Sequence, residues 1–552
     1  MLARINCSAV SGISGYVVEV EVDISFGLPI FNIVGLPETA VRESRERVKT
    51  AIKNSGYAFP MDRITVNLAP ADVKKEGTGF DLPVAMGILS ASKIVPPDRF
   101  NGYFMMGELS LDGRVKPVNG VLPAVLCAQE NGARGIIVPL ENRAEASMVK
   151  NIEVLPVESL GQVVDFFTGM RKIEPFSSNT DGLLSKDNFE LSDLDYCDVA
   201  GQNHAKRALE IAAAGGHNLC MSGPPGSGKT MLAKRIASIL PPLSFDEALE
   251  ATQVYSVAGL LKDQMPLVTQ RPFRAPHHTI SAPGLVGGGL RPEPGEVSLA
   301  HNGLLFLDEL PEFRRNVLEV LRQPMEDGMV RISRAGAKLA YPSVFMLVAA
   351  MNPCPCGYFG DSVKECTCTA SQIQRYRARI SGPLMDRIDI HIEVPAVSFG
   401  ELTGNAKPES SKEIRKRVEA ARQIQINRFK GNSGEIRGSS ASTQDYSARL
   451  QSSSSNQQSS SIQQGSSSQQ SSSRLQGSSV FCNARMRPRD IKKFCTLEPA
   501  ASSILEMAVD NLGLSARAYS RVLKISRTIA DLGGSEDILR QHVAEAVQYR
   551  EI

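Results

Sequence analysis

The residues with the clearest chemistry form a glycine-rich run, GPPGSGKT, which the segment MLAKRIASIL follows. Backbone N–H groups of such a run approach phosphate oxygens closely, and the next helix adds its positive dipole end. We expect Lys229 to reach the β- and γ-phosphates of a nucleotide and Thr230 to bind Mg²⁺. A ligand-free turn is the alternative, but the short strand Asn218–Ser222 supplies the context that the motif requires. The predicted phosphate-binding residues are Gly223, Pro224, Pro225, Gly226, Ser227, Gly228, Lys229 and Thr230.

Two acidic residues and an amide follow further apolar runs. Leu304–Leu307 leads into Asp308 and Glu309, and Val344–Ala350 precedes Asn352. The carboxyl ends of parallel strands lie at the edge of a sheet where ligands bind. We expect Asp308 to hold Mg²⁺ through water, Glu309 to polarise the attacking water and Asn352 to sense the γ-phosphate. The alternatives are a solvated strand end and a turn-forming Asn before proline.

Four of the ten cysteines are concentrated in one segment. Cys354-x-Cys356 and Cys366-x-Cys368 are joined by the turn-rich sequence GYFGDSVKE. Four thiolates can close a tetrahedral Zn²⁺ site, and a thiol cluster in a reducing compartment favours metal over disulfide. Unligated reduced thiols are the alternative, because C-x₂-C is the commoner pairing. We expect a structural, non-catalytic zinc ion just after the third apolar run.

Alternating strand and helix patterns must position these groups, and they predict an α/β fold. Val18–Ile24 has period two, and Thr39–Ser55 has a helical period that ends at a glycine. Further strands are expected at Ile64–Leu68, Tyr103–Met106 and Gly135–Val138, and helical periods at Lys412–Phe429 and Ala500–Leu532. The predicted organisation is an α/β domain over 1–170, a linker over 171–192, an ATPase core over 193–395 and a helical lid over 396–552. The Ser/Gln tract at 439–479 cannot bury enough apolar surface to fold, so we expect a disordered insert in the lid.

Composition is ordinary for a globular protein, with 42% hydrophobic and 22% charged residues. The formal net charge of +2 means that any contact with nucleic acid must come from local basic clusters. The N-terminus lacks the pattern of a signal peptide, and no apolar stretch is long enough to span a bilayer. We therefore expect a cytoplasmic protein without a membrane partner.

The order GPPGSGKT, LLFLDE, AAMN and GPLMDRID resembles an AAA+ ATPase of the magnesium-chelatase-like branch. The whole chain outside the Ser/Gln tract resembles the ComM/YifB family, through runs such as FRAPHHTISAPGLVGGG, SLAHNGLLFLDEL and MNPCPCG. This resemblance implies homo-oligomeric rings, usually hexamers, with ATP between protomers. It also implies that Val199 and Gln202 lie against adenine, that Arg517 is a nucleotide sensor at the start of a lid helix, and that Arg387 acts in trans. Arg375, Arg377 and Arg379 compete for that trans role, and a surface salt bridge is the alternative for Arg387.

Lys75–Gly79 and Gly107–Gly120 resemble the active-site segments of the Lon protease domain. The positions that match the Ser–Lys dyad of that family hold Gly79 and Leu122. Glycine has no hydroxyl and leucine cannot accept a proton, so we expect a scaffold without peptidase activity.

The segment MVRISRAGAKLAYPSVFMLV predicts a hairpin with a basic turn between the LLFLDE and AAMN strands. Arg331, Arg334 and Lys338 would bind DNA phosphates without reading sequence, or they would simply solvate the turn. Family members are associated with branch migration in natural transformation, so the resemblance implies an ATP-driven motor on single-stranded or branched DNA. The alternatives are a chelatase-like motor subunit and an ATP-dependent protein-remodelling regulator.

Overall fold

The computed structural model describes residues 1–178, 194–261, 265–289, 292–334, 337–361, 364–397, 409–437 and 482–550. The chain divides into two compact units that are each built from separate sequence segments. The first unit contains Met1–Glu190, Pro242–Leu305 and Phe313–Phe345, and the second contains Leu191–Pro241, Phe306–Glu312 and Met346–Ile552. The predicted insert at 439–479 and most of the predicted linker lie outside the described residues, and the predicted domain boundaries stay predictions.

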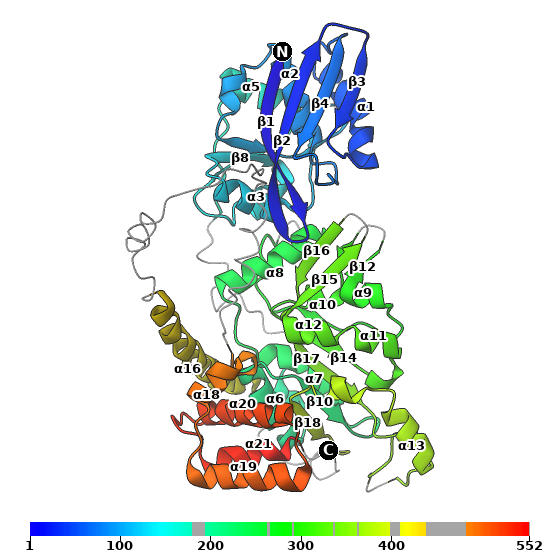
Figure 1. The fold of residues 1–552 in the computed structure, drawn as a ribbon, viewed down its shortest axis with the longest axis vertical. Helices are drawn as coiled ribbons and strands as arrows, with labels where there is room; N and C mark the ends of the chain where they lie inside the picture. The colour runs from blue at the N-terminus through cyan, green and yellow to red at the C-terminus, as the bar shows by residue number, and fades with distance from the viewer. Residues whose placement is uncertain are drawn as a thin grey trace, which may run out of the picture. The chain divides into compact units, whose positions relative to one another are not determined.

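A seven-stranded sheet organises the first unit, with the order β3-β4-β2-β1-β5-β8-β9 (Figure 1). β2 pairs antiparallel with both β1 and β4, whereas β3, β5, β8 and β9 join by parallel pairing. Val18, Val20 and Val22 are fully buried, which confirms the period-two prediction. The strands are β1 (Leu2–Ser11), β2 (Ser14–Ser25), β3 (Ile30–Val34), β4 (Arg63–Ala69), β5 (Tyr103–Met105), β8 (Gly135–Pro139) and β9 (Glu153–Val157).

Helices of the N-terminal segment pack on this sheet, and α1 begins at the predicted residue. They are α1 (Thr39–Asn54), α2 (Asp81–Ala91), α3 (Val121–Glu130), α4 (Arg143–Ala146) and α5 (Leu160–Thr168). The later segments of the first unit add α8 (Phe245–Val257), α9 (Ala282–Val286), α10 (Glu296–Leu299), α11 (Arg315–Glu319) and α12 (Arg322–Asp327). Short strand pairs are β6 (Glu108–Leu109) with β7 (Val115–Lys116), β12 (Gly287–Gly288) with β13 (Glu293–Pro294), and β15 (Met329–Arg334) with β16 (Ala337–Pro342).

A five-stranded sheet with the order β11-β14-β17-β10-β18 carries the glycine-rich loop. Its strands are β10 (Leu219–Ser222), β11 (Phe273–Arg274), β14 (Leu304–Leu307), β17 (Met346–Met351) and β18 (Ile390–Glu393). β10 pairs in parallel with β17 on one side and with β18 on the other. All residues of β10, β14 and β17 are buried, which explains why their sequences are apolar without alternation.

Helices of the second unit are α6 (Asn203–Gly215), α7 (Lys229–Ile239), α13 (Ala370–Arg377), α14 (Gly382–Met385), α16 (Ser411–Arg437), α18 (Pro488–Phe494), α19 (Pro499–Leu512), α20 (Ala516–Leu532) and α21 (Arg540–Gln548). The prediction of one helical segment over 500–532 is wrong in one respect, because two helices, α19 and α20, occupy this range. Gly513 has φ +59° and ends α19, and Ser515 then caps α20 by accepting from the N–H of Ala518.

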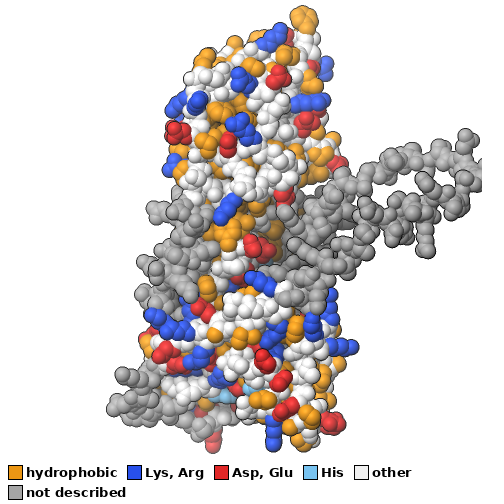
Figure 2. Space-filling model, turned by 90° about the vertical axis from the view of Figure 1, so that its left-hand side faces the viewer, with side chains coloured by type: hydrophobic (Ala, Val, Ile, Leu, Met, Phe, Trp, Pro, Cys, Tyr) orange, Lys and Arg blue, Asp and Glu red, His pale blue; other side chains and the backbone are white. Residues whose placement is uncertain are grey.

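No helix of the described residues has the length and apolarity that a bilayer crossing requires. On the face of the molecule drawn in Figure 2, basic and acidic side chains are interspersed rather than separated into large fields of one sign. This distribution agrees with the small net charge of the chain.

Candidate functional site

The glycine-rich loop connects β10 to α7, as the sequence predicts. Gly226 and Gly228 have φ of +79° and +88°, a region that favours glycine. At Gly223 the constraint is steric, because a Cβ atom there would lie 2.1 Å from the carbonyl oxygen of Val394, which follows β18. The loop therefore keeps a conformation that side chains at these positions would prevent.

Lys229 is the first residue of α7, and its amine turns back into the loop. Its Nζ donates to the carbonyl oxygens of Gly223 at 2.7 Å and Pro224 at 2.8 Å, and it lies 3.3 Å from Asn352 Oδ1. Burial lowers the pKa of Lys229, and the Asp308 carboxylate offsets part of that shift. A buried amine with carbonyl partners fits a site whose ligand is an anion, since phosphate oxygens would replace those acceptors.

Asp308 and Glu309 follow β14 directly, and one of them contacts the loop. Thr230 Oγ1 donates to Asp308 Oδ2 at 2.7 Å, so a hydroxyl and a carboxylate meet where Mg²⁺ is expected. Glu309 has φ +52°, a strained value for a residue with a side chain, and it is exposed. Glu309 is therefore an exposed carboxylate directly after the buried strand β14, next to Asp308.

Asn352 reaches the site because of strand register. Ser222 of β10 is paired with Met351 of β17, so the residues that follow these strands, Gly223 and Asn352, begin side by side. The amide of Asn352 therefore comes within 3.3 Å of the Lys229 amine. The structure brings the predicted groups from three strand ends into one cluster.

The residues assigned to adenine binding and to the lid lie in the second unit. Val199 is 5% exposed, and Gln202 has φ +56° and donates to the Pro395 carbonyl at 2.6 Å. Arg517 is the second residue of α20 and is exposed, which confirms its predicted place at the start of a helix.

The candidates for the trans-acting arginine differ in exposure. Arg387 is 7% exposed and donates to the Pro383 carbonyl at 2.6 Å. Arg375, Arg377 and Arg379 are exposed on or just after α13, where Arg379 pairs with Glu312 at 2.9 Å. A group that acts on a neighbouring protomer must reach the surface, and in the described conformation these three arginines satisfy that condition.

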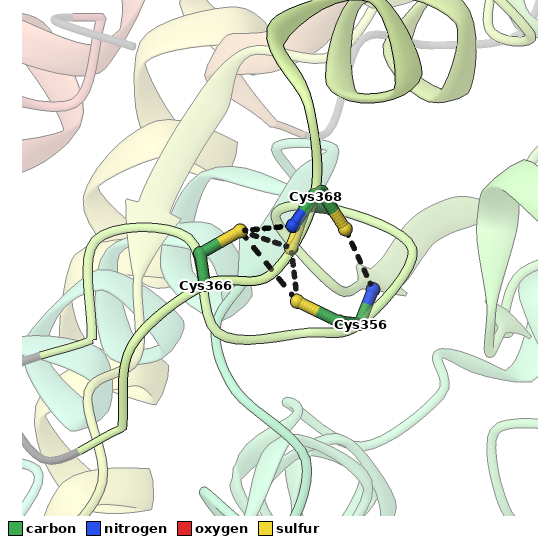
Figure 3. A group of neighbouring side chains, drawn as sticks. Cys356, Cys366 and Cys368 are labelled. Atoms are coloured by element: carbon green, nitrogen blue, oxygen red, sulfur yellow. Dashed lines mark hydrogen bonds between the residues drawn. The ribbon is translucent and has the colours of Figure 1, made fainter.

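The four clustered cysteines bring their sulfur atoms within 4.8 Å of one another. Figure 3 labels three of them, Cys356, Cys366 and Cys368. Cys354 Sγ lies 3.3 Å from Cys356 Sγ and 3.6 Å from Cys366 Sγ, and the latter two are 3.5 Å apart. A disulfide requires about 2.05 Å, whereas thiolates on one zinc ion stand about 3.8 Å apart. The spacing therefore fits a shared metal ion better than a covalent bond.

Backbone amides surround these sulfur atoms, as they do around bound thiolates. The N–H groups of Gly357 and Phe359 donate to Cys354 Sγ at 3.2 and 3.3 Å. Hydrogen bonds from the Tyr358 backbone and from neighbouring thiols lower the pKa of Cys356, whereas the same neighbours raise the pKa values of Cys366 and Cys368. Gly357 also approaches the glycine-rich loop, because a Cβ atom there would lie 2.6 Å from Pro225 Cδ. The donor set fits Zn²⁺, and the cluster abuts the nucleotide site.

The predicted basic hairpin exists as β15 and β16, with Arg331 opposite Ala340 and Ser333 opposite Lys338. Arg331 is exposed. The turn at 335–336 and the side chains of Arg334 and Lys338 lie outside the described residues, so their DNA contacts stay predictions.

The positions that match the Lon dyad carry no catalytic group. Leu122 is fully buried on α3, and Gly79 has only Met106 near the place of a side chain. The neighbouring amines are engaged elsewhere, since Lys74 pairs with Glu38 at 2.8 Å and Lys75 donates to the Pro70 carbonyl.

Sequence reasoning missed a buried charge network two residues after Arg387. Asp389 accepts from the backbone N–H of Asn218 at 3.1 Å and forms an ion pair with Arg521 of α20 at 3.2 Å. His217 stands 3.7 Å from the same carboxylate, and these neighbours hold the pKa of Asp389 well below its usual range although burial opposes that shift. The only sequence signal was an aspartate at the end of the GPLMDRID run, which is too common to identify a distant partner.

Comparison with known proteins covers nearly the whole chain. Family models described as magnesium chelatase subunit ChlI, subunit ChlI of Mg-chelatase and the ChlI C-terminal region match residues 195–402, 20–142 and 452–550. Competence protein ComM of Haemophilus influenzae is 42% identical over 553 residues, which cover 100% of this chain and 97% of the relative. The uncharacterized protein YifB of Salmonella typhimurium is 41% identical with the same coverage.

Part of the chain has a second, more distant relationship. Lon protease 2 of Bacillus subtilis is 31% identical over 169 residues, which cover 28% of this chain and 30% of the protease. Full-length similarity to ComM and YifB, together with the ChlI matches and the intact glycine-rich loop, decides the classification. The chain belongs to the ComM/YifB family of magnesium-chelatase-like AAA+ proteins, a membership that implies ATPase activity.

Proposed function

We propose that this chain is a cytoplasmic, ATP-driven motor that assembles into a hexameric ring and acts on single-stranded or branched DNA. In this proposal it drives branch migration while incoming DNA recombines during natural transformation. The name of the competence relative supports the process, and full-length similarity makes the transfer reasonable. The observation that carries the proposal is the hairpin β15–β16, placed in sequence between the strand before Asp308 and the strand before Asn352.

In the proposed ATPase cycle, amides of residues 223–230 and the Lys229 amine hold the triphosphate. Thr230 and Asp308 hold Mg²⁺, which neutralises charge on the phosphate oxygens when it is bound. Glu309 accepts a proton from the attacking water, and Asn352, already close to Lys229, positions that water or senses the terminal phosphate. Val199 and Gln202 border the base.

Hydrolysis between protomers needs an arginine from the neighbouring subunit and a sensor from the same chain. Arg517 supplies the sensor at the start of α20. Arg387 supplies the trans group by its place in the motif, although its buried side chain must then reorient on assembly. Arg375, Arg377 and Arg379 need no such movement. Mixing each Arg→Ala variant with a Glu309→Gln variant identifies the trans group. In a mixed ring the Glu309→Gln subunit can supply an intact arginine to the site of its Arg→Ala neighbour. Hydrolysis is therefore restored only when the replaced arginine acts in trans.

Zinc has a structural role in this proposal. Cys354, Cys356, Cys366 and Cys368 hold the ion and fix the loop that follows Asn352. The close approach of Gly357 to Pro225 transmits that rigidity to the phosphate-binding loop.

DNA binding is tested by ATPase rates with and without single-stranded and forked DNA, at low and moderate salt. Phosphate contacts release counterions, so stimulation by DNA should fade as salt rises. Replacing Arg334 and Lys338 by Glu should abolish DNA binding, measured by fluorescence anisotropy, while MgATP binding persists. ATPase rates that ignore DNA at every salt concentration would redirect the proposal to a protein or porphyrin partner.

A further inference from the structure

Helix α3, which carries the position that matches the protease lysine, is covered by residues of the ATPase segment. Leu122 is fully buried in a hydrophobic cluster that also contains Leu243, Ala248 and Leu267. α8 packs directly against α3 within the first unit. A peptidase must leave this position open to substrate, whereas here it forms part of an internal interface.

Buried polar contacts fix the end of α8 to the start of α3. Ser256 Oγ donates to Glu145 Oε1 at 2.5 Å, and the same oxygen accepts the backbone N–H of Leu122 at 2.8 Å. The backbone N–H of Gly120 donates to the Ser256 carbonyl at 3.1 Å. Each of these hydrogen bonds depends on a precise register between the two segments.

The turn between β1 and β2 makes a second contact, with the hairpin β15–β16. Ile13 is 6% exposed in a cluster with Val254 of α8, Leu299 and Tyr341 of β16. Gly12 has φ +64°, and a Cβ atom there would lie 2.7 Å from the Ala340 carbonyl oxygen. The backbone of the turn therefore lies directly on β16, at a position where a larger residue would force the two apart.

We propose that the Lon-like domain positions the hairpin β15–β16. Its docking surface for α8 and the hairpin is formed by Gly12, Ile13, Gly120, Leu122 and Glu145. α8 packs against the helix that carries the position matching the protease lysine, so in this chain that position serves the docking contact. Domain and hairpin then move together during the ATPase cycle. The inference rests on the proposed DNA function only in assigning DNA to the hairpin.

The test compares Ile13→Asp with Leu28→Asp in the full-length protein. Both changes put a carboxylate in a turn of the same sheet, but Leu28 is 79% exposed, whereas Ile13 contacts α8 and β16. An unpaired carboxylate in an apolar cluster is unfavourable, so Ile13→Asp should detach the hairpin and leave the N-terminal sheet folded. Hydrogen exchange at 250–257 and 329–342 should accelerate about tenfold in this variant and remain at the wild-type rate in Leu28→Asp.

The second readout is function. Ile13→Asp should keep the basal ATPase rate and lose stimulation by DNA about tenfold, the scale of a coupling between sites. If DNA does not change the ATPase rate of the wild-type protein, the proposed function fails. The hydrogen-exchange measurement then still tests whether the Lon-like domain docks on α8 and the hairpin. Should Ile13→Asp not fold, Ser256→Ala removes only the bond to Glu145, and its exchange at 250–257 should still rise. Exchange equal to that of Leu28→Asp, or full DNA stimulation despite faster exchange, would overturn the inference.

Discussion

Replacing Arg521 by Met tests whether helix α20 is held on the core by a buried charge pair. The side chains of Arg521 and Asp389 are only 17% and 11% exposed, and their charged atoms are 3.2 Å apart. Removal of one partner from a buried pair leaves the other charge without compensation, which costs about 3–5 kcal/mol. The N–H of Asn218 still donates to Asp389 in this variant. We therefore expect the free energy of unfolding to fall by about 3 kcal/mol, the lower end of that range.

The assay is urea unfolding at pH 7.5, with Arg114→Met as the matched control. Arg114 and Asp112 form a pair at 2.7 Å, but they are 66% and 52% exposed, and such surface pairs contribute little to stability. The double variant Asp389→Asn/Arg521→Met has neither charge, so its free energy of unfolding should be about 2 kcal/mol higher than that of Arg521→Met. Because Arg517 lies one turn before Arg521 on α20, the single variant should also raise the KM for ATP. A cost for Arg521→Met no larger than for Arg114→Met, or strict additivity in the double variant, refutes the buried-pair interpretation.

Three further measurements address other parts of the site. Glu309→Gln should retain MgATP binding and lower kcat about 10²–10⁴-fold, the range for loss of a general base; turnover near the wild-type rate would remove Glu309 from that role. Purified protein should contain zinc by mass spectrometry, and Cys366→Ser/Cys368→Ser should lose it and exchange amides faster at 354–368; metal-free wild-type protein under reducing conditions would contradict the zinc assignment. Burial, reinforced by Arg550, lowers the pKa of His391 from 6.5 to about 4, so the unfolded chain binds more protons between these values. Stability should thus be complete above pH 6.5 and fall by about 3 kcal/mol as the pH approaches 4, and His391→Gln should flatten this slope in urea unfolding.

The phosphate site could be predicted because its signals are contiguous. The loop, the apolar run Leu304–Leu307 and the hairpin each combine a local pattern with turn residues, and β14 has the predicted bounds. Asn352 needed one further assumption, parallel pairing of β10 with β17, which short buried apolar strands favour. Local periodicity also predicted α1 and the strand β2.

Long-range packing could not be predicted from those patterns. Asp389 and Arg521 are separated along the described chain by β18, α16, the Ser/Gln tract, α18 and α19, and neither residue type signals burial. The placement of Leu122 beside Ala248 is equally invisible, because both residues look like ordinary core positions of separate domains. Gly513 did carry a local signal, a helix-ending glycine, but continuous helical periodicity on both sides obscured it.

The order of elements connects the proposed nucleotide site to the hairpin β15–β16 by a short stretch of chain. β16 ends at Pro342 and β17 begins at Met346, so Asn352, whose amide contacts Lys229, lies ten positions after the last residue of the hairpin. Every residue of β17 is buried, and β17 lies between β14 and β10 in the sheet, so sliding it would break hydrogen bonds on both sides. A strand held in this way does not absorb a displacement by sliding. In the proposed cycle Asn352 responds to the γ-phosphate at one end of β17, and the other end of β17 continues through residues 343–345 to β16.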